Sequence, residues 1–189
     1  MSVASLNTFG GPTLDLGYAG QLTTDQPSAI MTRDNETTTG GSSTATPGLL
    51  DFGIAVARGV NAECCKRIAA DADLPIGITV RNPTLSPDGN QQVGYAPTMP
   101  VGIAYQGCIL AIAAENVTDG DQVLSLTAGA ASPSAVMYQV AGALAGPTGG
   151  LAGSGRVVVP GAQWCTTTAA GKVGKIRLTG VNSPKTTVS

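Results

Sequence analysis

Short apolar runs, separated by turns rich in Gly, Pro and Asn, make up most of the chain from residue 49 onward. The runs recur at intervals of about ten residues, which is typical of the strands of a β-sandwich or barrel. We therefore predict an all-β domain over residues 49–180 with little helix. The predicted strands lie within residues 49–59, 75–80, 94–114, 121–126, 135–144, 155–164 and 172–180.

One segment of this domain leaves two interpretations open. In residues 61–72, NAECCKRIAADA, Asn61 is a suitable helix cap, and Cys64, Cys65 and Ile68 would share one helix face. The segment also lies between two predicted strands, and CCKRI suits an extended chain equally well. The sequence does not decide between a short helix and a strand.

The first 48 residues have a different composition. Residues 13–20, TLDLGYAG, place Leu14, Leu16 and Tyr18 on one side of an alternating run, which predicts a short strand. Residues 32–48 are almost wholly polar around a Gly-Gly-Ser-Ser core and predict a mobile loop or linker. We therefore predict that residues 1–48 form an extended N-terminal arm with a flexible connection, and that residues 181–189 form a polar tail.

Charge is scarce in this sequence. Hydrophobic residues make up 42% of the chain and charged residues 12%, about half the usual share. Such a surface is expected where neighbouring subunits cover it, because interface cores are depleted of charge; the alternative is a monomer with few surface charges. The net charge is −2, and the sequence shows no cluster of basic residues that would form a positively charged surface. We therefore expect no nucleic-acid partner.

We expect neither export nor membrane insertion. The N-terminal residues MSVASLNTFGG lack the basic and apolar regions of a signal peptide. The longest nearly apolar run, residues 101–114, is shorter than the roughly twenty residues that span a bilayer. Cys64, Cys65, Cys108 and Cys165 are therefore expected to be reduced thiols that behave as small hydrophobic residues in a protein made in a cytoplasm.

The sequence offers no set of residues suited to catalysis. It contains no histidine, which removes Ser-His-Asp and Cys-His pairs and histidine-ligated zinc. Nearly all its carboxylates lie beside Gly, Asn or Pro, where Asp commonly stabilises a turn. The glycine-rich residues 146–156 lack the spacings that bind phosphate or dinucleotides. We expect no enzymatic activity and no cofactor.

Residues 115–126, ENVTDGDQVLSL, contain three carboxylates. The segment has three possible interpretations: a metal site, a glycosylation site or a turn. The order Asp119-Gly120-Asp121 does not match a calcium-binding EF-hand loop, and Leu126 stands where its final Glu is needed. Asn116-Val117-Thr118 is a glycosylation acceptor only in a secreted chain. We predict a strand, an Asp-Gly turn and a second strand, with no metal.

Two further features have a functional and a structural interpretation. The adjacent Cys64 and Cys65 could form a redox or metal pair, but they lack the neighbouring ligands that such a pair needs, so a structural role is favoured. Trp164 is the only tryptophan, and we interpret it as an anchor of the core or of an interface.

The order of several motifs resembles the structural cement, or decoration, proteins of tailed-phage capsids. The resemblance covers residues 19–180, while the insertion at residues 37–48 and the CCKR segment depart from it. The motifs are Gly-x4-Asp-x-Pro-x-x-Ile (Gly20, Asp25, Pro27, Ile30), Phe-Gly-x-Ala-Val (52–56), Ile-Gly-Ile (76–78), a Gly-Asp turn (120–121) and Gly-Ala-x-Trp…Ala-Gly-Lys (161–172).

The resemblance implies a β-sandwich of jelly-roll type without catalytic activity. It also implies a virion protein, made in the host cytoplasm, that binds the outside of the major capsid shell and stabilises it. Its partners would be the major capsid protein and other copies of itself, as a homodimer or homotrimer. The residues expected to contact other chains are Leu14, Leu16, Tyr18, Leu22, Ile30 and Trp164; the alternative is that Leu14, Leu16 and Tyr18 form an edge strand of their own domain.

A second function remains open at the level of sequence. The chain could be a tail- or fibre-associated adhesin, that is, a module that binds glycans or a host surface. Such a module needs an exposed patch of aromatic and polar side chains, because aromatic rings supply most of its contact area. The candidates are Trp164, Tyr95, Tyr105 and Tyr138.

Overall fold

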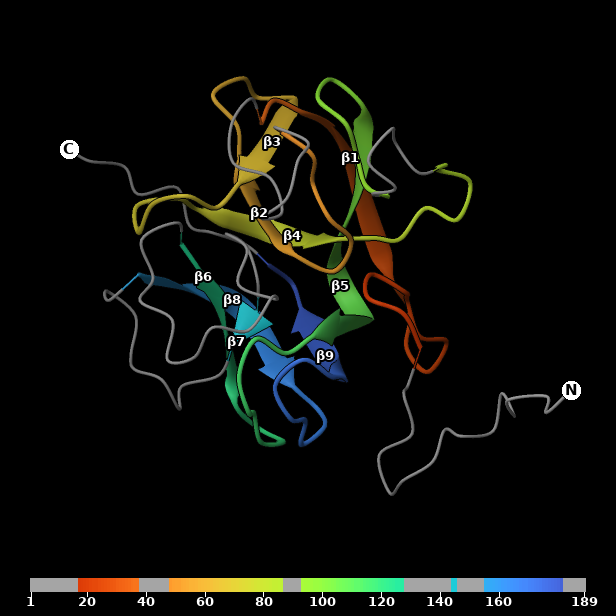
Figure 1. Cartoon of the computed structure of the whole chain (residues 1–189), viewed down its shortest axis with the longest axis vertical. Helices are drawn as coiled ribbons and strands as arrows, with labels where there is room; N and C mark the ends of the chain where they lie inside the picture. Colours follow the sequence, from red (N-terminus) through yellow and green to blue (C-terminus); the bar gives the residue numbers. More distant parts are fainter. Residues whose placement is uncertain (1–16, 38–47, 87–92, 128–143, 146–154, 182–189) are drawn as a thin grey trace, which may run out of the picture.

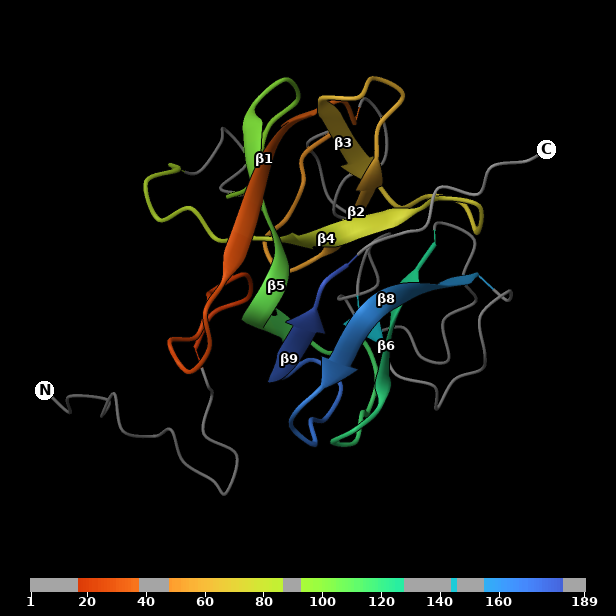
Figure 2. The same ribbon diagram turned by 180° about the vertical axis from the view of Figure 1, so that it is seen from behind.

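The computed structural model describes residues 17–37, 48–86, 93–127, 144–145 and 155–181. Throughout these ranges the regular structure is β, without helix, which confirms the predicted fold class. Figures 1 and 2 show the strands from opposite sides. They are β1 (Ala29–Asn35), β2 (Ala55–Arg58), β3 (Cys64–Arg67), β4 (Pro75–Thr79), β5 (Pro100–Ile112), β6 (Gln122–Leu126), β7 (Leu144–Ala145), β8 (Arg156–Trp164) and β9 (Val173–Thr179).

The strands form one sheet that closes on itself at one end. Its order is β1-β3-β2-β4-β5-β9-β8-β6-β7, and β1 also pairs with β5. β1 pairs with β3 in parallel and with β5 in antiparallel orientation. Because β1 pairs with both, the strands β1, β3, β2, β4 and β5 form a small closed barrel. The architecture is therefore a barrel-like sheet, and the jelly-roll arrangement is not confirmed.

The closed end has its own apolar core. Alternate side chains of the barrel strands point inward and pack with residues from the connecting loops. This cluster consists of Leu50, Ile54, Val56, Cys65, Ile76, Tyr95, Val101 and Ile103, with Met31, Phe52 and Leu85 packed against it. Side chains thus fill the inside of the barrel.

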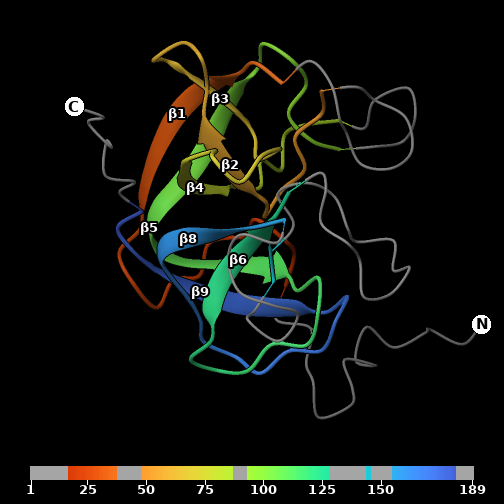
Figure 3. The ribbon, with the colours of Figure 1, turned by 90° about the vertical axis from the view of Figure 1, so that its left-hand side faces the viewer.

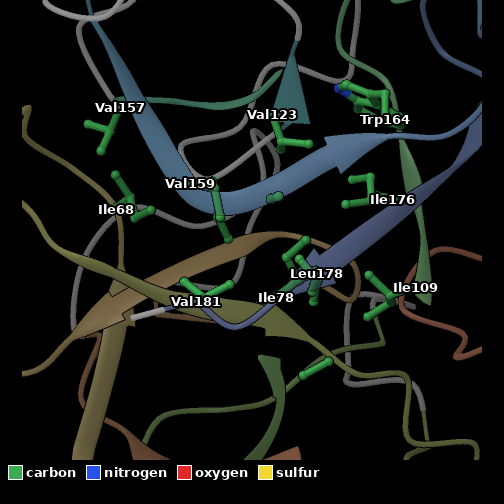
Figure 4. Packing of buried hydrophobic residues seen from close by; sticks show 14 of the residues in the cluster. Ile68, Ile78, Ile109, Val123, Val157, Val159, Trp164, Ile176, Leu178 and Val181 are labelled. Carbon is green, nitrogen blue, oxygen red and sulfur yellow. The ribbon is translucent and has the colours of Figure 1, made fainter. Parts of the chain in front are cut away.

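A larger core lies between the barrel and the remaining strands. β5 extends beyond the barrel, and its residues 106–112 pair with β9. In Figure 3, β6, β8 and β9 lie on the opposite side of β5 from β1, β2 and β3. Their inner side chains meet the outer face of the barrel, as Figure 4 shows for Val159, Ile78 and Leu178. β4 lies between the two cores and is buried at all five positions.

Most predicted strands are observed close to where the apolar runs placed them. Six of the seven runs contain an observed strand longer than two residues. The predicted strand 135–144 overlaps the described residues only at Leu144, the first residue of β7. Residues 64–67 form β3, which decides the open choice for residues 61–72 in favour of an extended chain.

The expected N-terminal arm is not confirmed by the described part of residues 1–48. Residues 29–35 are β1, and Leu22 forms an antiparallel bridge with Ile109. The polar residues 32–35, which predicted a linker, are strand residues of the closed barrel. The prediction was wrong here because strand pairing uses main-chain N–H and C=O groups, which polar side chains do not prevent. Residues 1–16, 38–47 and 182–189 lie outside the described residues. Of the predicted polar tail 181–189, only Val181 is described, and it is buried in an apolar core cluster instead of belonging to a polar tail.

Candidate interaction surface

The structure separates the six residues that were expected to contact other chains. Leu14 and Leu16 lie outside the described residues. Trp164 is 0% exposed and packs in the larger core, next to Val123 and Ile176 in Figure 4. Of its two interpretations, anchor of the core or anchor of an interface, the first is confirmed, because no part of its side chain reaches the surface. Leu22 is partly buried against the same core.

Tyr18 and Ile30 do lie on the surface. The exposed fraction is 65% for Tyr18 and 48% for Ile30. Within the described ranges, the other large hydrophobic residues that are exposed are Val60 and Leu74. Exposed apolar side chains of this size are common singly on monomers, so their surroundings decide whether they form a site.

Tyr18 and Phe52 both contact the guanidinium of Arg81, and the three side chains are here called the aromatic–arginine stack. The guanidinium carbon of Arg81 lies 4.7 Å from the ring centre of Tyr18 and 5.6 Å from that of Phe52. Cations are attracted to the faces of aromatic rings at such distances. Phe52 in turn meets Tyr95 edge to face, with ring centres 5.4 Å apart. Through these rings the exposed Arg81 is connected to the barrel core.

Two glycines allow the segments that carry this stack to meet. Gly20 and Gly53 have φ of 79° and 72°, a backbone conformation that favours glycine. A Cβ on Gly20 would lie 2.7 Å from the backbone nitrogen of Arg81 and 2.9 Å from Cβ of Phe52. Arg81 N also donates a hydrogen bond to Gly20 O at 2.7 Å. Both glycines belong to the motifs of the sequence resemblance, and the structure shows that those motifs touch.

Ile30 lies on the outer face of the barrel. It stands opposite Ala104 in the β1–β5 ladder, and Val80 and Ile30 both come close to Gly102. A Cβ on Gly102 would lie 3.6 Å from Cβ of Val80 and 3.8 Å from Cγ2 of Ile30. Ile30 is thus an exposed apolar residue on a strand face that also carries the exposed Thr32 and Asp34.

The tip of the β2–β3 hairpin, residues 59–63, presents Val60, which is 90% exposed. The carboxylate of Glu36 accepts hydrogen bonds from the backbone N–H groups of Val60 and Asn61, at 2.5 and 3.4 Å. Arg33 donates to the carbonyl of Ala62. Two side chains at or next to β1 thus hold this tip in one conformation.

The acidic segment 115–126 is a turn, as predicted. Gly120 has φ of 93°, and Asp121 N donates to Thr118 O at 3.0 Å while the Asp121 carboxylate accepts from Thr118 N at 2.7 Å. The strands on its two sides do not form a hairpin, however, because β6 pairs with β8 and not with β5. Glu115 forms an ion pair with Arg156 instead of pointing toward the other acids.

Groups that could perform chemistry are not gathered in the parts that the structure describes. No group of three or more His, Cys, Asp and Glu side chains is placed to hold a metal ion among them. A shallow hollow is lined by Gly120, Gln122, Gly161, Ala162, Gln163 and Thr179, which bring neither a carboxylate nor an aromatic ring. The described ranges also contain no helix long and apolar enough to cross a membrane.

The cysteines are free thiols in two environments. Cys65 and Cys108 are buried, whereas Cys64 and Cys165 are partly exposed. Burial, followed by the neighbouring Cys64, raises the pKa of the Cys65 thiol to about 12. Burial likewise raises the pKa of Cys108. Because the thiolate is the reactive form, these two buried cysteines are unreactive side chains of the core.

The described aromatic candidates for an adhesin, Trp164, Tyr95 and Tyr105, do not form an exposed patch. Trp164 and Tyr95 are buried, Tyr105 is half-buried against the larger core, and Tyr138 lies outside the described residues. The residues that sequence reasoning missed are Arg81, Phe52 and Glu36. Phe52 and Gly20 stood in the resembling motifs, but nothing in the sequence indicated that Arg81 would contact two aromatic rings.

The described residues form a β protein that exposes a few large hydrophobic side chains. Compared with known families, the chain matches that of the structural cement protein (E217 gp24/Pam3 gp6) over residues 7–179. Among solved structures it is similar to a chain of the capsid of Myoviridae phage XM1, with a TM-score of 0.56 and 16% identity, covering 87% of this chain and 91% of that one. No curated protein matches the sequence.

The match spans nearly the whole chain, so the protein belongs to the phage structural cement family. This confirms the resemblance inferred from the glycine motifs, and it assigns the protein a structural role associated with the phage capsid. The similarity to the XM1 capsid chain, at low identity, shows a shared fold.

Proposed function

We propose that this protein binds the outside of the major capsid shell and stabilises it, without enzymatic activity of its own. The observation that carries the proposal is the match to the structural cement family over residues 7–179. The barrel supports it physically: a closed, well-packed sheet can transmit load between shell subunits without deforming, because protein interiors are as dense as organic crystals.

The distribution of exposed groups supports the same function. Tyr18, Ile30 and Val60 are exposed on different parts of the barrel end, and each is held by contacts within the chain. Several small contacts of this kind bind weakly one by one. On a shell that repeats the same surface many times, simultaneous contacts raise the overall affinity without any single strong site.

We further propose that residues 1–16 reach a neighbouring chain and that the protein acts as a homodimer or homotrimer on the shell. Support comes from the alternating Leu14 and Leu16, which continue toward the exposed Tyr18. An extended segment of this kind can add a strand to an exposed sheet edge of a neighbour.

The test is addition of the purified protein to capsids that lack it. Binding is measured by gradient sedimentation and quantitative mass spectrometry. Hundreds of copies per particle, saturating at a whole multiple of the shell symmetry, are expected. A few copies per particle would indicate a tail or vertex component, and no bound copies would overturn the proposal.

A shorter deletion tests the role of the N-terminus more sharply than removal of the whole arm. Deleting residues 1–31 would remove half of β1 and the Leu22–Ile109 bridge, so the barrel would not close. Deleting residues 1–16 removes none of the described residues. Normal shell binding by that variant would contradict the proposed role of residues 1–16 alone.

A further inference from the structure

We propose that Arg81 is the group through which this protein binds a carboxylate side chain on the surface of the capsid shell protein. The inference rests on the proposed function, since it names the contact that would hold the protein on the shell. It is carried by three observations: the contact of Arg81 with two aromatic rings, the lack of an ion pair to Arg81 among the described residues, and the hydrogen bonds of the backbone beneath it.

The stacking leaves the edge of the guanidinium available. Tyr18 and Phe52 both lie within cation–π distance of Arg81, at 4.7 and 5.6 Å from their ring centres. Aromatic rings contact the flat faces of a guanidinium, whereas its N–H donors point outward in the plane. Two parallel N–H groups match the two oxygens of a carboxylate, which makes a bidentate pair.

No carboxylate of the described residues forms an ion pair with Arg81. The ion pairs found there join Lys66 to Asp73, Arg67 to Asp51, Arg156 to Glu115 and Lys175 to Asp25. Arg81 is exposed and takes part in none of them. Within the described ranges, Arg81 is thus an exposed guanidinium beside two aromatic rings that forms no ion pair, and it is complementary in charge to an acidic side chain of another protein.

The backbone around Arg81 is fixed before any partner binds. Arg81 N donates to Gly20 O at 2.7 Å, and Gly53 N donates to Thr79 O at 2.9 Å. Tyr95, which supports Phe52, donates its hydroxyl hydrogen to Val80 O at 2.6 Å. Binding therefore orders few additional side-chain and backbone groups, and this is the main way in which preorganisation raises affinity.

The site also has the residue types that dominate protein interfaces. Tyrosine and arginine are enriched among the residues that contribute most to binding, especially where an aromatic ring shields the charged pair from water. Tyr18, with 65% of its surface exposed, would become buried when a partner covers the stack. A nucleic-acid phosphate is disfavoured as the ligand because the chain has a net charge of −2.

The test compares shell binding by the wild type and by variants of the stack, using capsids that lack the protein. Arg81→Gln removes the charge, and we expect the dissociation constant to rise about tenfold or more. Arg81→Lys keeps the charge but loses the planar donors, so an intermediate loss is expected. Tyr18→Phe retains the ring and should bind normally, whereas Tyr18→Ala should bind less tightly.

Arg58→Gln is the matched control, because Arg58 is an exposed arginine on β2 outside the stack. Its binding should equal that of the wild type, and all variants should keep the wild-type melting temperature. If the wild type fails to bind shells, the proposed function fails. If the wild type binds and Arg81→Gln binds equally well, the proposed function stands and the role of Arg81 is overturned.

Discussion

The guanidinium of Arg156 donates two hydrogen bonds to the carboxylate of Glu115, at 2.8 and 3.0 Å. Only 4% of the Arg156 side chain and 11% of the Glu115 side chain are exposed. The pair joins the first residue of β8 to the loop that follows β5. A buried bidentate pair of this kind fixes the relative position of two segments that are far apart in the sequence.

Glu115→Ala is expected to lower the free energy of unfolding by about 3–5 kcal/mol, because it leaves the buried charge of Arg156 without its carboxylate. The measurement is denaturant unfolding followed by tryptophan fluorescence of Trp164. The double variant Glu115→Leu with Arg156→Met should be closer to the wild type, since it buries no charge. A loss below about 1 kcal/mol for Glu115→Ala would show that the pair is as weak as an exposed one.

Gly20→Ala is expected to destabilise the protein more than the same substitution at Gly180. Both positions have positive φ, 79° and 108°, so both substitutions strain the backbone. Only at Gly20 does the added Cβ also meet backbone, 2.7 Å from Arg81 N, whereas nothing lies within 4 Å at Gly180. Thermal unfolding of the two variants checks this order. Equal destabilisation would mean that the contact between residues 20 and 81 loosens at little cost.

Acid should weaken the contact between Asp25 and Lys175 of β9, because it protonates the Asp25 carboxylate. Hydrogen bonds from Thr23 and then Lys175 hold the pKa of the Asp25 carboxyl at about 2, below its usual 3.8. A depressed pKa in the folded state stabilises the fold above pH 3.8, and this contribution is lost as the pH falls to about 2.

The comparison that isolates this effect is between the wild type and Asp25→Asn. The difference in their unfolding free energies should be constant from about pH 5 upward and should shrink toward zero between about pH 4 and pH 2. Lys175→Met should also reduce the acid dependence, because it removes one of the two groups bonded to Asp25. A difference that does not change over this interval contradicts the assigned pKa.

Thiol labelling should divide the four cysteines into two classes. Iodoacetamide at mildly alkaline pH is expected to modify Cys64 and Cys165 in the folded protein, because both are partly exposed. Cys65 and Cys108 should react only after unfolding, since burial raises the pKa of both thiols. Peptide mass spectrometry before and after denaturation gives the result. Rapid labelling of folded Cys65 would show that β3 opens readily.

The sequence predicted the strands better than it predicted how they pair. Alternation and turn residues mark β2, β4, β5, β6, β8 and β9 because each of them buries at least one apolar face. The partner of a strand depends on contacts far along the chain, so the sequence did not indicate that the strand after the Asp119-Gly120 turn pairs with β8 and not with β5. β1 was missed because its residues 32–35 are all polar, and main-chain pairing does not require apolar side chains.

The candidate surface could be predicted only in part, for a similar reason. Tyr18 and Ile30 were identified from the apolar positions of the N-terminal segment, and the structure finds both exposed. Trp164 was assigned to an interface because a single large aromatic residue suits a core and an interface equally well. The contacts of Arg81 with Tyr18 and Phe52 join three segments that are far apart in the sequence. A local sequence pattern cannot predict such contacts.

The central claim is that this protein stabilises the capsid from outside, and the most direct test is the thermal stability of the particle. Capsids with and without the bound protein are heated, and DNA release is followed with an intercalating dye. Decorated capsids should release DNA at a higher temperature, and the shift should saturate together with the number of bound copies. Identical release temperatures at full occupancy would contradict the account.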